Sequence, residues 1–549
     1  MPLHTLRELD RTDGTVQLRQ VHHHHRHDAA SPSASPSTST DDLVLVPRPS
    51  PTDPNDPLRW PPWKKHAAFG SVCAFTFLTN YAIGGLAPAF YILSLEFDKT
   101  MTETSALLLW PILVLGVFNY VWVPLANYTG KRPVFVFASA LLCAAYIWGA
   151  QAATFDSLLW SNIVGAVAGS TTEALGASTV NDLYFLHERG SRMGVYMNSI
   201  AGGNTVGPLV CGFLVTSLSW RWHKWIAAIL TCLNFLAVLF FVPETRYLRD
   251  ADQKIGAGAS VDDVHTRVSV GGGGGEKTSP SVGVAPATIL TLTASSAAPA
   301  VPKKTWLQEA HPWSGITPGT SLLRMFARPF PMFAYPCVVF AFLGYAVALV
   351  LTVAVNILNS FVLQAPPYNW SPSVNGLINI PGLLGNLLGG WAGGGLVDHY
   401  CDWRLRRRGG VFEPESRLVL LVLPAVVTGA GCLLFGFGVQ QSLHWTSLFF
   451  GYGMVSFALT AVPTITMAYV SDCLLPVNAD ALMLVNGTKN VVAFGFLYGI
   501  VPWVADVGYA ACFGAQAGIF VAIIAIGALL LLRFGAAIRH RQAQWRIIL

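Results

Sequence analysis

Twelve long apolar stretches constrain this chain more than any other feature of its sequence. Each has about 20 residues, the length that an α-helix needs to cross the hydrocarbon core of a bilayer. Only 11% of the 549 residues are charged and 53% are hydrophobic, whereas soluble domains have roughly 25% charged residues. We therefore predict an all-α membrane protein with twelve transmembrane helices in two six-helix halves. The predicted spans are 67–92, 104–126, 133–152, 157–180, 193–217, 224–242, 333–362, 373–397, 417–439, 445–471, 481–504 and 510–533.

Composition shifts divide the chain into five segments. Residues 1–65 are rich in Ser, Pro, His and Thr and are predicted to form a disordered cytosolic tail. Residues 66–242 form the first half, and residues 333–535 form the second. Between them, 243–332 contains Gly271–Gly275 and reads as a cytosolic low-complexity linker. Residues 536–549 are predicted to be a cytosolic C-terminal tail.

The distribution of Lys and Arg predicts the orientation of the chain. Cytosolic loops carry an excess of these residues. With the N-terminus inside, the short loops and tail on that side contain most of the basic residues, whereas the opposite loops contain Lys99, Arg221 and Lys224. Both termini are therefore predicted to be cytosolic. The basic residues on the inner side are Lys131, Arg132, Arg189, Arg192, Arg404, Arg406, Arg407, Arg408, Arg417, Arg539, Arg541 and Arg546.

Histidines and cysteines are the possible metal ligands of this chain. The histidines His22–His25 and His27 could bind a metal, but we favour an ordinary low-complexity tail. Eight of the nine cysteines, all but Cys401, lie in apolar stretches without metal-site spacing. We predict them to be small buried side chains rather than disulfides or ligands. No metal and no cofactor is expected.

Glu173 is the strongest candidate for function, because ionisable groups within a membrane span are costly and usually functional. At 3.6 residues per turn it shares a face with small and polar residues, including Asn162, Gly169 and Ser170. Such a face packs against other helices, so Glu173 is predicted to point into the bundle. A buried carboxyl tends to hold a proton, and a nearby cation tends to displace it. Proton and cationic substrate would then compete for one site.

Other polar residues within the spans are further candidates for binding substrate or protons. The predicted set is Asn80, Tyr81, Asn198, Asn356, Asn359, Asn379 and Asn490, with Asn204, Asn375 and Asn486 as additional candidates. Lys489 lies about nine residues into its span, roughly 13 Å deep. We favour a structural role for Lys489, in which it snorkels to the cytosolic face or pairs with Asp472 or Asp480.

Motifs near the helix ends point to gating. In the fifth span Gly203, Gly207 and Gly212 permit close packing, and Pro208 bends the helix. The loops after the second and eighth spans, PLANYTGKRP and GGGLVDHYCDWRLRRRGG, occupy equivalent places in the two halves, as an internal repeat would. After the second loop, Glu413 and Glu415 are predicted to neutralise Arg406, Arg407 or Arg408 and to hold the halves together. The alternative is that these basic residues only reflect the excess of Lys and Arg in cytosolic loops.

These motifs resemble those of the major facilitator superfamily. The GP-containing fifth span is similar to its antiporter motif, and the run from Asp182 to Gly190 with RRRGGVFEPESRL resembles a fungal branch of twelve-helix drug:proton antiporters that includes polyamine and cation carriers. The family's loop pattern is G-x-L-x-D-x-x-G-R-[KR]. The first copy in this chain keeps Gly130, Lys131 and Arg132 of that pattern, but Asn127 stands in place of its Asp. The second copy keeps Asp398.

The resemblance implies a monomeric transporter that works by alternating access, not an enzyme. Its partners would be a small-molecule substrate, protons and the bilayer, with no nucleic acid. We expect proton-coupled export of a hydrophobic or cationic compound. Uptake of polyamines or other organic cations and a transporter-like sensor stay open as alternatives. The fungal resemblance implies the plasma membrane, with the vacuolar membrane as the alternative.

Overall fold

The computed structural model describes residues 16–17, 47, 49–50, 53–247, 302–309, 311, 313, 322–364, 368–407, 411–474 and 477–543. Most of the predicted N-terminal tail including its histidines, much of the predicted linker and residues 544–549 lie outside the described residues.

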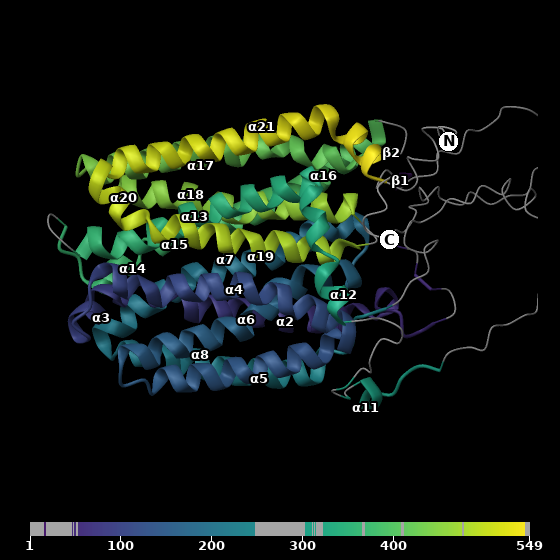
Figure 1. Ribbon diagram of the computed structural model, residues 1–549, viewed down its shortest axis with the longest axis horizontal. Helices are drawn as coiled ribbons and strands as arrows, with labels where there is room; N and C mark the ends of the chain where they lie inside the picture. The colour runs from purple at the N-terminus through teal and green to yellow at the C-terminus, as the bar shows by residue number, and fades with distance from the viewer. Residues whose placement is uncertain are drawn as a thin grey trace, which may run out of the picture.

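The described chain is almost entirely helical, and its helices run side by side along the long axis of the molecule (Figure 1). The first half contains α2 (Pro62–Gly84), α3 (Phe90–Glu96), α4 (Met101–Thr129), α5 (Lys131–Ala150), α6 (Phe155–Leu183), α7 (Leu186–Ser217) and α8 (Trp220–Phe241). The second contains α13 (Pro336–Gln364), α14 (Pro372–Gly376), α15 (Asn379–Trp391), α16 (Val397–Arg407), α17 (Val422–Gln440), α18 (Trp445–Cys473), α19 (Asn478–Tyr498), α20 (Ile500–Val507) and α21 (Tyr509–Ala543). The predicted all-α membrane fold is confirmed.

Among the described residues, nine helices are long and apolar enough to cross a membrane, and α19 with α20 makes a tenth, bent by 41°. The two remaining predicted spans correspond to α6 and to the segment from α14 to the start of α16. Helix α6 is polar but deeply buried, since every residue from Ala168 to Asn181 is enclosed. The segment α14–α16 is interrupted by a π-helical turn at Ala392–Leu396, where three glycines follow one another.

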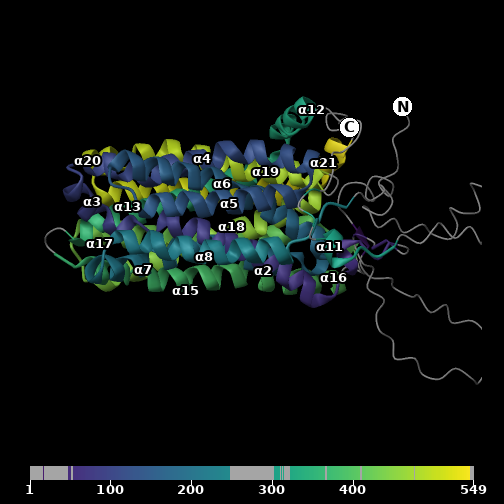
Figure 2. The ribbon, with the colours of Figure 1, turned by 90° about the horizontal axis from the view of Figure 1, so that it is seen from below.

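The bundle has two distinct ends. Figures 1 and 2 place α11 (Trp306–Glu309), α12 (Leu322–Ala327) and α16 at one end, which we name the proximal end. They place α3 and α20 at the other, the distal end. In the predicted topology the proximal end is cytosolic.

Local sequence explains where several helices begin. Thr100 and Glu103 form a reciprocal capping box at the start of α4. Thr154 accepts a hydrogen bond from the backbone of Ser157 at the start of α6. Gly130, with φ of 103°, joins α4 to α5 in a backbone conformation that side chains disfavour.

Two features differ from the sequence expectations. Cys143 of α5 and Cys232 of α8 form a disulfide with a Cα–Cα distance of 5.6 Å, so the prediction of free thiols was wrong for this pair. The pattern of apolar spans does not show which helices are neighbours, which is why the pairing was missed. A two-residue strand, β1 (Val16–Gln17), pairs antiparallel with β2 (Val411–Phe412). The N-terminal tail is therefore ordered at this point.

Candidate functional site

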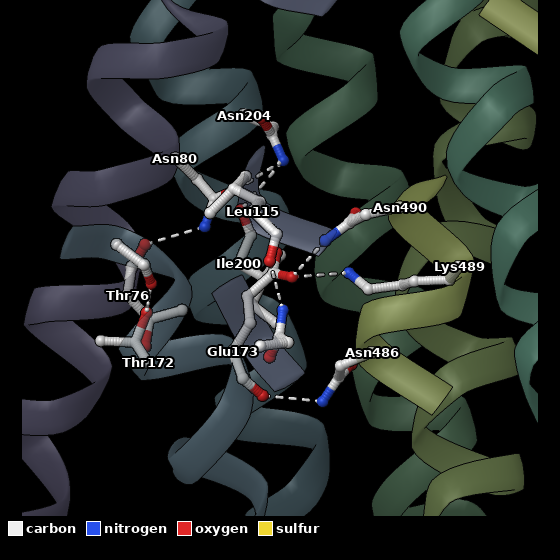
Figure 3. Close-up of polar contacts among 12 residues, drawn as sticks. Thr76, Asn80, Leu115, Thr172, Glu173, Ile200, Asn204, Asn486, Lys489 and Asn490 are labelled. Carbon is white, nitrogen blue, oxygen red and sulfur yellow. Dashed lines mark hydrogen bonds and ion pairs between the residues drawn. The ribbon is translucent and has the colours of Figure 1, made fainter. Parts of the chain in front are cut away.

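A buried ion pair joins the two halves in the middle of the bundle. Glu173 Oε2 of α6 lies 3.2 Å from Lys489 Nζ of α19, and the two side chains are 3% and 1% exposed. Asn490 donates to the same carboxylate oxygen at 2.7 Å, and Asn486 donates to the backbone carbonyl of Glu173 at 2.7 Å. Figure 3 shows the three side chains reaching α6 from one face of α19, as their i, i+3, i+4 spacing dictates.

Lys489 therefore points to the centre and not to a helix end. The prediction that it snorkels or pairs with Asp472 or Asp480 was wrong, since its carboxylate partner is Glu173. Its ammonium group also lies 4.1 Å from the ring centroid of Tyr345 on α13. This cation–π contact is strongest where water is excluded. Tyr345 was missed because nothing in the sequence of its apolar span indicates which face meets Lys489.

A small cavity of about 30 Å³ adjoins the ion pair. It is large enough for about one water molecule. Its polar lining comes from both halves, and its apolar lining is made of Ile, Leu and Val side chains. The polar residues are Asn80, Glu173, Asn204, Asn356, Lys489 and Asn490. Of the predicted binding residues, the structure thus brings together Glu173, Asn80, Asn356 and Asn490.

Hydrogen-bonded amides extend from the cavity into each half. In the first half Asn204 donates to Asn80 Oδ1 at 3.2 Å, and Asn80 donates to the carbonyl of Thr76 at 2.9 Å (Figure 3). In the second half the Tyr452 hydroxyl lies 3.1 Å from Asn356 Oδ1 and 3.3 Å from Asn379 Oδ1. Asn379 is therefore connected to the cavity through Tyr452 and does not line it.

Three other predicted residues lie elsewhere. Tyr81 stacks on His223 with ring centroids 4.5 Å apart. Asn198 sits where α7 approaches Gly390. Asn359 is buried on α13 with its carbonyl oxygen unpaired. None of these three residues lines the cavity beside Glu173, so their role in binding stays a prediction. Most faces of the inner helices are buried, so polarity alone does not identify the face that meets the cavity.

A charged network closes the proximal end. Arg189 of α7 lies 3.1 Å from Asp472 of α18, crossing between the halves. Arg417 bridges Asp472 at 2.7 Å and Asp398 at 2.8 Å. Asp398 also accepts a hydrogen bond from the backbone N–H of Ser191 at 2.7 Å, again across the halves. Burial raises the pKa of the Asp398 carboxyl above its ordinary value, although Arg417 opposes this effect.

The equivalent loop of the first half makes different contacts. Lys131 donates to Asp182 at 2.5 Å, and Arg132 donates to backbone carbonyls that include Val242 and Leu239. Asn127, which replaces the acidic residue of the family pattern, lies 3.5 Å from Asp480 of α19. The carboxylate in this contact is thus supplied by the second half, and Arg328 binds it at 3.0 Å.

The predicted partners of Glu415 were wrong, whereas those of Glu413 stay a prediction. Glu413 lies 3.7 Å from Arg404. Glu415 forms a two-point pair with Arg539 of α21 at 2.7 and 2.9 Å, which ties together parts of the second half only. Arg406 pairs with Asp402 at 3.2 Å, and the predicted partner Arg408 lies outside the described residues.

The glycines of α7 serve two interfaces. A Cβ atom at Gly207, next to Pro208, would lie 2.5 Å from the carbonyl oxygen of Tyr81 on α2. At Gly212 it would lie 2.6 Å from the carbonyl oxygen of Pro372 at the start of α14. Gly207 therefore packs within the first half, whereas Gly212 packs across the halves.

Contacts across the halves also close the distal end. Ser360 of α13 donates to the carbonyl of Ala87 at 3.0 Å, and Gln364 donates to the carbonyl of Pro88 at 3.0 Å. With both ends in contact and a cavity of about 30 Å³ between them, this is an occluded conformation.

Comparison with known proteins decides the family. The model of the Major Facilitator Superfamily matches residues 71–488. The chain belongs to the major facilitator superfamily. It is a multi-pass membrane protein and a secondary transporter, not an enzyme. Among solved major facilitator structures, the proton:xylose symporter XylE is similar with a TM-score of 0.56 at 12% identity, covering 86% of this chain and 96% of that one.

Several fungal proteins are more similar to this chain in sequence. An uncharacterised transporter of Schizosaccharomyces pombe is 25% identical, covering 85% of this chain and 83% of that protein. A protein of Aspergillus flavus described as a probable efflux pump is 22% identical, covering 83% and 99%. The antiporter QDR3 of Candida albicans is 23% identical, covering 75% and 69%.

Proposed function

We propose that this transporter exchanges protons for a small hydrophobic organic cation. The observation that carries the proposal is the Glu173–Lys489 pair, which crosses the two halves inside an occluded cavity. The distant relatives described as an antiporter and a probable efflux pump favour exchange in the direction of export.

The position of the pair explains how binding could drive movement. Alternating access requires the halves to rock about the central site, so α6 and α19 must change their contact there. Leaving one member of a buried pair without its partner costs roughly 3–5 kcal/mol. A proton on Glu173, or a substrate cation beside it, reduces this cost. Because both act on the same carboxylate, each displaces the other, which couples their movements.

The surroundings indicate the chemistry of the substrate. Tyr345 already holds the Lys489 ammonium group over its ring, so the same face suits a substrate ammonium. The apolar lining from Ile, Leu and Val residues suits a hydrophobic body. Glu173 is the one carboxylate lining this cavity. This favours a single positive charge over a polyamine.

The proximal contacts are proposed to be the gate. Asp398 and Asp472 connect to α7 through Ser191 and Arg189, and these contacts must break when the proximal end opens. Lys131, Arg132 and Gly130 hold the equivalent loop of the first half. The proposed orientation keeps this end in the cytosol, with the protein in the plasma membrane.

Flux in proteoliposomes tests the function. The purified chain is reconstituted into vesicles, and a pH gradient is imposed. Labelled organic monocations are then added outside the vesicles, with a polyamine serving as comparison. We expect gradient-driven accumulation of a monocation that Glu173→Gln abolishes while pH-independent binding persists. Glu188→Gln is the matched control, since Glu188 is exposed on α7. Gradient-driven flux that survives in Glu173→Gln would contradict the proposal, and so would gradient-independent flux.

A further inference from the structure

A second cavity lies at the proximal end, away from the central site. It has a volume of about 460 Å³ and lies between the start of α2, the end of α8 and the segment 302–309 that contains α11. Figure 1 places α11 at the proximal end below the first-half helices. Neither the transport site nor the charged network at Asp472 reaches this cavity.

The cavity has a strongly basic wall. One acidic residue, Glu309, accompanies five basic ones, and it already pairs with Lys64 at 2.6 Å. Lys303 and Lys304 are exposed, and their side chains have no carboxylate partner among the described residues. The basic lining residues are Arg59, Lys64, Arg132, Lys303 and Lys304.

The opposite wall is apolar and faces the surroundings of the bundle. Trp63 is 67% exposed, Phe240 48% and Phe241 47%. These residues lie at the proximal ends of α2 and α8, where a lipid-facing helix surface meets the membrane interface. Aromatic side chains are favoured at that depth.

The basic wall is held in place by specific contacts. Asn55 donates to the carbonyl of Pro302 at 3.1 Å and accepts from the backbone N–H of Lys304 at 2.9 Å. The Lys64–Glu309 pair holds α11 against α2. The segment is thus fixed beside the first half and closes the cavity on one side.

We propose that this cavity binds the headgroup of a phospholipid with several phosphate groups, such as a phosphoinositide. Basic pockets at the cytosolic ends of transmembrane helices are suited to such headgroups. The lining carries five basic side chains against one carboxylate, so a headgroup of high negative charge suits it better than one with a single charge. The aromatic wall places the acyl chains beside α2 and α8, so the ligand is a membrane lipid and not a free phosphate.

A second cavity of about 340 Å³ adjoins the first and extends the site. It shares Trp60, Arg132, Pro243, Lys304 and Glu309 with its neighbour. Its further charged or titratable lining residues are Glu244, Arg246 and His311. The polar lining of this inner space suits the phosphates, whereas the outer cavity leads to the lipid-facing aromatic residues.

Equilibrium binding to the full-length protein in phosphatidylcholine nanodiscs tests the proposal. The probes are fluorescent short-chain phosphatidylinositol bisphosphate and soluble inositol trisphosphate. The variants are Lys303→Gln with Lys304→Gln, and Phe241→Ser. Because each basic contact near a charged surface contributes roughly fivefold in affinity, the double variant should bind the lipid at least roughly tenfold more weakly. Phe241→Ser should weaken binding of the lipid but not of inositol trisphosphate.

A matched control removes two charges elsewhere at the same end. Arg406→Gln with Arg407→Gln should change lipid affinity less than roughly twofold, since these residues do not line the cavity. Equal losses in both double variants, or unchanged lipid affinity in the Lys303–Lys304 variant, would overturn the proposal. Binding of inositol trisphosphate as tight as that of the lipid would show a site for a free phosphate ligand instead, which also overturns it.

Discussion

At the scale of the residue, the Glu173–Lys489 pair makes a prediction about stability that is independent of transport. Glu173→Gln or Lys489→Gln alone leaves one buried charge without its partner, at a cost of roughly 3–5 kcal/mol. The double variant removes both charges and should recover much of this loss. Thermal unfolding of the purified single and double variants measures the coupling between the two positions.

This double-mutant cycle needs a reference pair at the protein surface. Lys99 and Glu103 lie 3.5 Å apart and are exposed, and exposed pairs contribute about 0–1 kcal/mol. The same double substitution there should show little coupling. If the losses at Glu173 and Lys489 simply add, the two charges do not stabilise each other and the pair is not a latch between the halves.

The sequence predicted the identity of the central acid but not its partner. Glu173 stood out because a carboxylate is rare in a membrane span, and the predicted Asn80, Asn356 and Asn490 do line its cavity. Lys489 was also visible, but only packing shows that α19 faces α6. Asn198 and Asn359 lie outside this cavity and stay predicted binding residues, since the sequence of a span does not show which helices it will contact.

At the scale of the element, the packing of α7 on α2 depends on Gly207. A Cβ atom there would lie 2.5 Å from the backbone oxygen of Tyr81, which cannot move without displacing α2. Gly207→Ala should therefore cost about 1–3 kcal/mol in stability. Gly518→Ala is the control, since a Cβ atom there has nothing within 4 Å, and it should leave the unfolding temperature unchanged or raise it slightly.

The proximal network predicts how α7 and α18 separate. Asp472→Asn removes the partner that Arg189 and Arg417 share. The charged network at the proximal end should then open more often. Cys401 reports on it, because it is buried in α16 and burial raises the pKa of its thiol to about 11. Maleimide labelling of Cys401, followed by peptide mass spectrometry, should become at least roughly tenfold faster. Labelling as slow as in the control Asp402→Asn would show that Asp472 does not hold the proximal end closed.

Whole elements were easier to predict than their irregularities. The apolar stretches predicted the helices because each must satisfy its backbone inside a bilayer. The strand pair of β1 with β2 arises from a contact between distant segments, and the π-helical turn at Ala392–Leu396 is a local irregularity within a helix. Neither has a period in the sequence that could have revealed it.

At the scale of the whole molecule, the occluded state predicts that locking either end stops the cycle. Ser360 and Ala87 meet across the distal end. Cysteines at both positions, joined by a short bis-maleimide, should abolish flux. The control variant carries Trp148→Cys and Ser157→Cys, two positions that lie together within the first half. Cross-linking this variant should leave flux intact, and so should treatment of the wild type with the same reagent. Full flux after complete cross-linking of positions 87 and 360 would rule out opening at that end.

The depth at which α6 is buried also has a consequence for biosynthesis. This helix enters the membrane long before α19 exists, since Asn490 follows Glu173 by 317 residues. During synthesis, the helices already made must therefore shelter the carboxyl group of Glu173 from the lipid. The central site of the nascent chain is incomplete until α19 is inserted. Synthesis that stops earlier leaves a first half in which the carboxyl group on α6 has no partner from α19.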